Sequence, residues 1–240
     1  MVDRISSDKP KLHISRTQLR QMCAVYEPGV GLDPDNSERL NRIDREFREA
    51  FKLLEDMPKS VSIFGSNVVT EGNQYYGEAR RLAARLAREL HYAVVTGGGP
   101  GIMEAANRGA AEAGGVSVGF TIDIAHAEPS NAYANRELPF HYFFTRKVAL
   151  SFAASMYIFF PGGYGTLDEF FELITLIQTR KIQSIPIVCF GTRYWHPVER
   201  LLDTYARQEG YISDNDLALF TVTDDLDEII RLARQAPLRE

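Results

Sequence analysis

Hydrophobic and polar residues alternate along the chain in blocks that predict short strands separated by amphipathic helices. From Lys59 onward, short runs rich in Val, Ile and Phe are followed by longer segments rich in Ala, Leu and Arg. The short runs have the length and content of buried strands, and the longer segments have the composition of helices. The predicted strands are SVSIF (60–64), YAVVT (92–96), VSVGFTI (116–122), FHYFF (140–144), MYIFF (156–160) and IPIVCF (185–190).

Helices are predicted between these strands and after the last of them. Apolar strands that alternate with helices form a parallel sheet covered on both faces. We therefore expect the α/β class, with a doubly wound, mostly parallel sheet of about six strands. The predicted helices span 75–90, 102–114, 146–155, 166–179, 196–210 and 224–235.

The first 58 residues differ from the rest of the chain. A loop rich in Pro, Gly and Asp precedes a helical pattern at 37–57, for which Ser37 is a plausible N-cap. We expect an N-terminal helical extension over 1–58 and one main domain over 59–240. The apolar residues that recur at helical spacing in the extension are Leu40, Ile43, Phe47, Phe51 and Leu54.

Composition narrows the classes of protein to which the chain can belong. The chain is 45% hydrophobic and 25% charged, as soluble globular proteins are. A net charge of -5 argues against a broad nucleic-acid surface. The two cysteines form no CxxC, and no apolar stretch is long enough for a membrane span or a signal peptide. We expect a cytoplasmic protein with neither a nucleic-acid nor a membrane partner.

Three glycine-rich loops follow predicted strands, at 65–67, 97–101 and 161–166. In a parallel sheet all three lie at one edge, where backbone N–H groups and helix N-termini favour an anion. Simple turn chemistry is the alternative for each loop. The loops match no common nucleotide signature, because Ile102 breaks GxGxxG and no P-loop is present. The five histidines are scattered, so no metal site is expected.

A basic pair, Arg146 and Lys147, stands in the first turn of a predicted helix that Thr145 could cap. Cations are disfavoured at that end of a helix. Two readings stay open. The pair is either a surface pair neutralised by a nearby acid, or it faces a phosphate or a catalytic carboxylate.

An acidic pair, Asp168 and Glu169, stands in the first turn of the helix that follows PGGYGT. Such acids are common in a first helical turn, and this reading stays open. In the other reading, Thr166 and its glycines hold a 5′-phosphate, and Glu169 faces the attached sugar. A carboxylate there could stabilise the oxocarbenium-like transition state of glycosidic cleavage.

The segments GGGPGIMEAANRGA and PGGYGTLDE closely resemble the paired motifs of the LOG family. Its members are cytokinin riboside 5′-monophosphate phosphoribohydrolases, long misannotated as lysine decarboxylases. The resemblance covers roughly residues 59–230 and is greatest to the larger bacterial subgroup. It implies a Rossmann-like nucleotide-binding domain, a nucleoside 5′-monophosphate substrate, a free base and ribose 5-phosphate as products, and no cofactor.

The resemblance also implies roles for individual residues. The catalytic arginine and glutamate of the family fall on Arg146 and Glu169. A dimer whose interface contributes to the site is also implied, so a homodimer or higher oligomer is expected. The expected substrate-binding residues, from the loops and the family motifs together, are Gly65, Ser66, Gly98, Gly99, Met103, Glu128, Lys147, Gly163, Tyr164, Gly165, Thr166 and Thr175.

Two other functions compete with hydrolysis. One is a non-catalytic protein that binds a nucleotide or a phosphorylated cofactor, as related proteins that carry molybdenum cofactor do. The Arg146 and Glu169 pair argues for the enzyme, since a pure binder has no need of it. The other is a lysine decarboxylase, which is disfavoured because no lysine lies in an evident pyridoxal phosphate site.

Overall fold

The computed structural model describes residues 34–122 and 130–239. The chain divides into two compact units between Arg42 and Ile43, and the larger unit contains the sheet. Helix α2 (Pro34–Leu54) runs across this division. The prediction that Ser37 caps this helix is wrong, because the helix already includes Pro34, a residue suited to a first turn.

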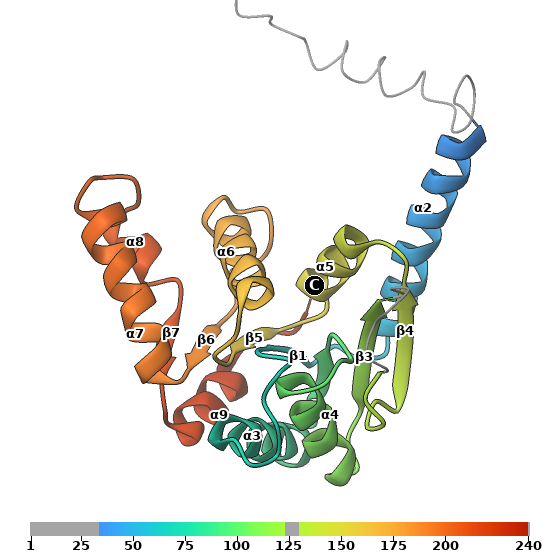
Figure 1. The fold of residues 1–240 in the computed structure, drawn as a ribbon, viewed down its shortest axis with the longest axis horizontal. Coiled ribbons are helices and arrows are strands. Elements are labelled where there is room, and N and C mark those ends of the chain that lie inside the picture. Colours follow the sequence, from blue (N-terminus) through green and yellow to red (C-terminus); the bar gives the residue numbers. More distant parts are fainter. Residues whose placement is uncertain (1–33, 123–129, 240) are drawn as a thin grey trace, which may run out of the picture. The chain divides into compact units, whose positions relative to one another are not determined.

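A single parallel sheet forms the centre of the larger unit (Figure 1). In the described residues it has seven strands in the order β4-β3-β2-β1-β5-β6-β7, and every neighbouring pair is parallel. This confirms the predicted Rossmann-like α/β fold. The strands are β1 (Ser60–Phe64), β2 (Ala93–Thr96), β3 (Ser117–Ile122), β4 (Arg136–Phe140), β5 (Met156–Phe159), β6 (Ile187–Phe190) and β7 (Thr221–Thr223).

Both edge strands differ from the prediction. β4 is the polar segment Arg136–Phe140, and the predicted strand FHYFF is wrong because its last residues begin a helix. Pro139 is tolerated in β4 because an edge strand leaves one row of backbone groups unpaired. β7 was not predicted, since three residues of mixed burial give too short a pattern. The five central strands lie where the apolar runs place them.

Helices cover both faces of the sheet. α3, α4 and α9 gather on one face, and α5, α6 and α7 on the other (Figure 1). Each face has its own buried apolar core. The helices are α3 (Gln74–Leu90), α4 (Ile102–Glu112), α5 (Phe143–Phe152), α6 (Tyr164–Gln178), α7 (Thr192–Leu201) with the π-helical turn η1 (Leu202–Arg207), α8 (Asp214–Leu217) and α9 (Leu226–Gln235).

The core on the α5–α7 face is built around aromatic rings. Phe159 of β5 contacts Phe170 of α6 and Trp195 of α7 in edge-on arrangements, with ring centroids 5.5 and 6.2 Å apart. All three side chains are fully buried. This packing fixes α6 over the end of β5, the strand from which its preceding loop emerges.

The strand order reverses direction between β1 and β5. From β1 the chain adds β2, β3 and β4 on one side, and then returns to add β5, β6 and β7 on the other. Loops that leave two such adjacent strands diverge over opposite faces, and ligands of open α/β sheets bind in the crevice between them. None of the described helices has both the length and the apolar character that crossing a membrane requires.

Candidate active site

A cleft of about 340 Å³ lies at the carboxyl ends of β1 and β5, where the strand order reverses. It brings together residues that are far apart in the sequence. Nine of the fourteen residues predicted from the sequence line it. The lining residues are Phe64, Gly65, Ser66, Asn67, Gly97, Met103, Arg146, Leu150, Gly163, Tyr164, Gly165, Thr166 and Glu169.

Backbone hydrogen bonds tie the glycine-rich loops to one another. The Ser66 N–H donates to the carbonyl of Pro161 (3.0 Å), and the Ile102 N–H donates to the carbonyl of Ser66 (2.9 Å). The Tyr194 hydroxyl of α7 donates to the carbonyl of Gly162 (2.7 Å). All three loops are therefore held at one edge of the sheet, as the sequence predicts.

The PGGYGT loop leads directly into α6, with Gly163 as the residue before its first turn. Leu167 makes the first intrahelical bond, to the carbonyl of Gly163 (3.1 Å). The N–H groups of the preceding residues therefore have no acceptor within the helix. Because α6 begins at Tyr164, the prediction that Asp168 and Glu169 lie in its first turn is wrong.

The glycines of this loop serve two different needs. A Cβ at Gly162 would lie 2.1 Å from the Thr166 hydroxyl oxygen, so the buried Thr166 requires glycine there. A Cβ at Gly163 or Gly165 would meet no protein atom within 4 Å. Their φ values are not positive either, so neither packing nor backbone conformation requires glycine at 163 and 165. Both residues line the cleft.

A buried polar network holds the GGGPG loop. The Asn107 side chain of α4 accepts from the Thr96 hydroxyl (2.6 Å) and from the Asn131 amide (3.0 Å). The Asn131 amide also donates to the carbonyl of Gly99 (3.0 Å), and the Asn131 N–H donates to that of Gly98 (2.8 Å). Sequence reasoning missed these asparagines, because no local pattern indicates which distant groups they bind.

Arg146 enters the cleft from α5 and is anchored by two backbone carbonyls. Its Nε donates to Phe120 (2.5 Å) and its Nη2 donates to Gly97 (3.0 Å). A Cβ at residue 97 would lie 2.0 Å from Nη2, so the guanidinium needs a glycine at this point. Burial lowers the pKa of Arg146, and the charge of Glu169 opposes that change. The guanidinium stays protonated at neutral pH.

α5 begins earlier than predicted. It starts at Phe143 with Tyr142 as the preceding residue, so the prediction that Thr145 caps it is wrong. Arg146 is consequently the fourth residue of the helix, at the end of its first turn rather than at its start. The carbonyls of Phe120 in β3 and of Gly97 in the GGGPG loop accept the N–H groups of its guanidinium.

Glu169 is half-buried on α6 and lines the same cleft. Burial raises the pKa of its carboxyl to about 7, and the positive charges of Arg146 and Lys147 limit the rise. Thr166 and Glu169 are three residues apart and so share one face of α6. A carboxyl that titrates near neutral pH beside a fixed cation is suited to proton transfer or to stabilising positive charge.

Lys147 joins α5 to α6 outside the cleft lining. Its Nζ lies 2.7 Å from a carboxylate oxygen of Asp168 and 3.0 Å from one of Glu172. Of the two interpretations of the basic pair, neutralisation by a nearby acid therefore describes Lys147. Its predicted contact with substrate stays a prediction.

Three other predicted residues that the structure describes do not line the cleft, and a fourth is not described. The Thr175 hydroxyl is exposed and donates to the carbonyl of Phe171 (2.7 Å) within α6. Gly98 and Gly99 shape the loop behind the cleft, and Gly98 has a φ of +71°. Glu128 lies outside the described residues. The described residues contain no cluster of three or more His, Cys, Asp or Glu side chains that could hold a metal ion.

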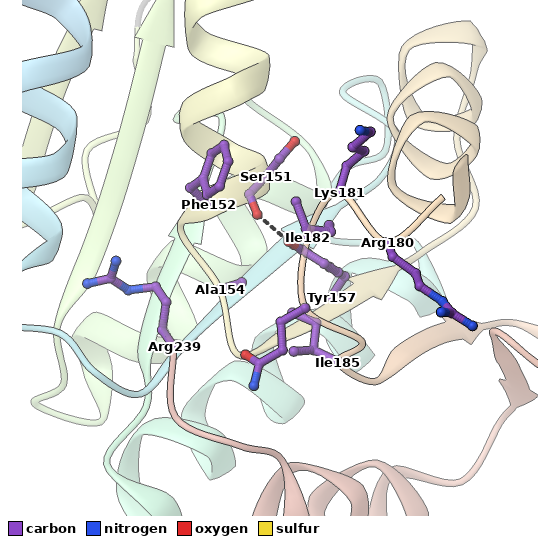
Figure 2. Close-up of a pocket in the computed structure, with 10 residues that line it drawn as sticks. Ser151, Phe152, Ala154, Tyr157, Arg180, Lys181, Ile182, Ile185 and Arg239 are labelled. Carbon is purple, nitrogen blue, oxygen red and sulfur yellow. Dashed lines mark hydrogen bonds between the residues drawn. The ribbon is translucent and has the colours of Figure 1, made fainter. Parts of the chain in front are cut away.

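A second cleft, of about 390 Å³, opens at the amino ends of β5 and β6 (Figure 2). Ser151, Tyr157 and Arg239 are among its lining residues, and the Tyr157 hydroxyl donates to the carbonyl of Ser151. None of the residues predicted to act on a ligand lines it. We place the candidate active site at the carboxyl edge, where parallel sheets bind ligands.

Comparisons with known proteins agree on the family. A family model described as "Possible lysine decarboxylase" matches residues 103–233. The chain is 27% identical over 179 residues to the cytokinin riboside 5′-monophosphate phosphoribohydrolase of Rhodococcoides fascians, which covers 74% of this chain and 90% of that protein.

Two further proteins resemble the chain, one in sequence and one in fold. The chain is 31% identical over 187 residues to the pyrimidine/purine nucleotide 5′-monophosphate nucleosidase of Escherichia coli K12, covering 72% of this chain and 40% of that protein. The molybdenum cofactor carrier protein of Chlamydomonas reinhardtii shares the fold, with a TM-score of 0.55 and 19% identity over 74% of this chain and 96% of that one. On the family match and these relatives, the chain belongs to the LOG family, also described as lysine decarboxylase-like.

Proposed function

We propose that the protein hydrolyses the N-glycosidic bond of a nucleoside 5′-monophosphate, such as AMP or a cytokinin riboside 5′-monophosphate. Water adds to C1′ of the ribose, and the C1′–N bond breaks with its electron pair passing to the base. The base takes up the proton that the water loses. The products are the free base and ribose 5-phosphate, and no cofactor takes part.

The observation that carries this proposal is the position of Glu169 relative to the mouth of α6. The first N–H groups of α6 and the open space beside Gly163 and Gly165 suit a phosphate. Glu169 follows Tyr164 by five residues, which is roughly 7–8 Å along the helix. A ribose 5-phosphate bridges such a gap, so C1′ would lie beside the carboxyl.

Glu169 and Arg146 have complementary roles in this mechanism. The ionised Glu169 stabilises the positive charge that develops at C1′, or orients the attacking water. Arg146 supports the ionised form of Glu169 through its charge and assists departure of the base. Thr166, Ser66 and the glycines of the loops hold the phosphate. A protein that only binds a nucleotide has no need of Arg146 and Glu169 in the same cleft.

The expected homodimer is part of the same proposal. α5 exposes aromatic side chains that a partner subunit would cover, namely Phe143, Phe144 and Phe152. Exposed aromatic side chains of this kind favour an interface.

The test is to incubate the purified protein with AMP and with its N6-isopentenyl analogue, and to measure released base by chromatography. We expect Glu169→Gln and Arg146→Ala each to lower kcat by about a hundredfold or more, because each removes a charge from the reacting centre. Glu228→Gln on α9 makes the same change at another half-buried glutamate and serves as the control.

Two results would contradict the proposal. Full activity in both site variants would remove Glu169 and Arg146 from the mechanism. Tight nucleotide binding by calorimetry without any release of base would favour the non-catalytic binding protein instead.

A further inference from the structure

Helix α2 contains one carboxylate that is buried, in contrast to its many exposed charges. Glu46 is 6% exposed. A buried carboxylate is costly unless hydrogen bonds satisfy it. Its Oε1 accepts the His141 N–H (2.8 Å), and its Oε2 accepts the Thr145 hydroxyl. Both donors flank the start of α5, about a hundred residues further along the chain.

These bonds stand where α5 lacks a cap of its own. Tyr142 precedes the first turn of α5, and its side chain makes no capping hydrogen bond. The carboxylate of Glu46 accepts the N–H of His141, just before the helix, and the hydroxyl of Thr145, in its first turn. It also lies at the end of the helix where a negative charge is stabilising. Thr145 is fully buried, so solvent does not replace Glu46, and the hydroxyl has the carbonyl of Tyr142 (2.8 Å) as its other acceptor.

The turn that Glu46 holds is the turn that carries Arg146. The Arg146 N–H donates to the carbonyl of Tyr142 (3.2 Å), which closes the first turn next to Thr145. The Arg146 guanidinium then reaches the carbonyls of Phe120 and Gly97. A shift of this turn therefore moves the backbone of Arg146, and with it the guanidinium that lies in the cleft.

α2 also contacts the far end of α5. The rings of Phe51 on α2 and Phe152, the last residue of α5, meet edge-on with centroids 6.0 Å apart. Ala50 and Leu54 of α2 belong to the same buried core as Ala149 and Leu150 of α5. α2 thus contacts α5 at both the first and the last turn of α5.

We infer that Glu46 is a positioning residue for the reaction, through which α2 holds the first turn of α5 and so fixes Arg146 in the cleft. This inference rests on the proposed function for its kinetic consequence. It assigns a role in the active site to a helix that lies outside the motifs from which the site is predicted.

The test uses the full chain with Glu46→Ala, which leaves the His141 N–H without its acceptor and the Thr145 hydroxyl with the carbonyl of Tyr142 alone. We expect kcat for AMP to fall at least tenfold while KM changes less than threefold, because Arg146 is misplaced and the phosphate loop is intact. Hydrogen–deuterium exchange of the peptide covering 141–150 should accelerate at least tenfold.

Two further variants separate positioning from general loss of stability. Glu46→Gln keeps an acceptor for His141, and its amide can donate to Thr145, so kcat should stay within threefold of the wild type. Tyr92→Phe removes another buried hydrogen bond, from the Tyr92 hydroxyl to the carbonyl of Ala233 (2.8 Å), far from α5. It should lower the melting temperature and leave kcat and the exchange at 141–150 unchanged.

The outcomes also separate this inference from the proposed function. If Glu46→Ala unfolds the chain, Glu46→Gln and Thr145→Val carry the comparison, and Thr145→Val is expected to accelerate exchange at 141–150. Exchange and kcat in Glu46→Ala, or exchange in Thr145→Val where Glu46→Ala unfolds, equal to those of Tyr92→Phe would overturn the inference. If the wild type releases no base, the proposed function fails, and the exchange measurements alone decide whether Glu46 holds the turn.

Discussion

At the scale of single residues, the candidate site depends on one carboxyl and one guanidinium that are only partly accessible to water. Glu169 has a pKa raised to about 7 because burial penalises its charge, and Arg146 and Lys147 oppose that rise. Arg146 keeps its charge in a buried setting because backbone carbonyls accept its N–H groups. Neither environment follows from residue type. Both follow from where α5 and α6 meet.

The pKa of Glu169 leads to a prediction about the pH dependence of catalysis. If the ionised carboxyl is the active form, kcat/KM should fall as pH drops below about 7, by roughly tenfold between pH 8 and pH 6. The measurement is kcat/KM for AMP from pH 5 to 9. A substrate phosphate titrates near pH 6, so a midpoint near 7 identifies the carboxyl. A flat profile between pH 6 and 8 would exclude this role.

The sequence indicated the pair proposed to react, Arg146 and Glu169, but not the residues that hold it. Arg146 and Glu169 come from motifs with fixed spacing, and the fold brings both into one cleft. Asn107 and Asn131 could not be found in the same way. Their hydrogen bonds join α4 to a segment beyond β3, and such pairing exists only once the sheet is formed.

At the scale of elements, the relation between α5 and α6 sets the geometry of the site. Lys147 forms ion pairs with Asp168 and Glu172, which are four residues apart on one side of α6. Arg146 directly precedes Lys147 in the chain, and Glu169 directly follows Asp168. The ion pairs therefore hold the two groups that are proposed to react at a fixed position relative to each other.

The ion-pair cluster of Lys147, Asp168 and Glu172 should also shift the pH at which kcat/KM falls to half of its maximum on the acid side. The charge of Lys147 lowers the pKa of Glu169, whereas the charges of Asp168 and Glu172 raise it. We expect Lys147→Met to move the midpoint of the acid limb to higher pH and Asp168→Asn to move it to lower pH, each measured as kcat/KM for AMP.

A control for this prediction exists on the other face of the sheet. Arg80→Met breaks a similar helix-to-helix ion pair, between Arg80 and Glu112 at 2.7 Å, and should leave the midpoint unchanged. Shifts of the same sign in Lys147→Met and Asp168→Asn would contradict an electrostatic origin.

The start of α5 shows what local pattern can and cannot indicate about an element. FHYFF has the aromatic content of a strand, yet Phe143 and Phe144 open the helix. The structure adds a remote contact here, since Glu46 of α2 accepts hydrogen bonds from both His141 and Thr145. Apolar periodicity predicted the interior of each helix well, because the buried face repeats there, whereas it does not indicate at which residue a helix begins.

At the scale of the whole molecule, the alternation of strands and helices was sufficient to predict a parallel, doubly wound sheet. The three glycine-rich loops then had to meet at its carboxyl edge. The position of the reversal between β1 and β5 was not predictable from the pattern, because it depends on which strand pairs with the first. This reversal is what places GSN and PGGYGT on the two sides of one cleft.

Glu169 should reduce the stability of the folded protein as pH rises. Its pKa of about 7 in the folded state exceeds its ordinary value of 4.5, so folding is favoured while the carboxyl is protonated. This contribution is complete below pH 4.5 and is lost as pH rises through 7. Glu169→Gln should therefore raise the melting temperature at pH 8 but hardly at pH 5.

The size of this effect is limited by solvent. Glu169 is half-buried, so screening reduces the gain to the order of 1 kcal/mol, or about 2–4 °C for a chain of this length. Calorimetry at pH 5 and pH 8 measures the difference in melting temperature between wild type and Glu169→Gln, and Glu228→Gln is the matched control. Equal melting temperatures of wild type and Glu169→Gln at pH 8 would contradict the burial argument.

The contact between Gly97 and Arg146 has a consequence for how such a protein changes over time. Any side chain at 97 collides with the guanidinium, so mutation of the glycine is harmful for as long as the arginine is present. Once the arginine is lost, only the flexible side chain of Met103, whose sulfur lies 2.8 Å from such a Cβ, opposes a substitution at 97. After that substitution, restoring the arginine requires two reversals. A lineage that abandons this chemistry is thereby steered away from regaining it.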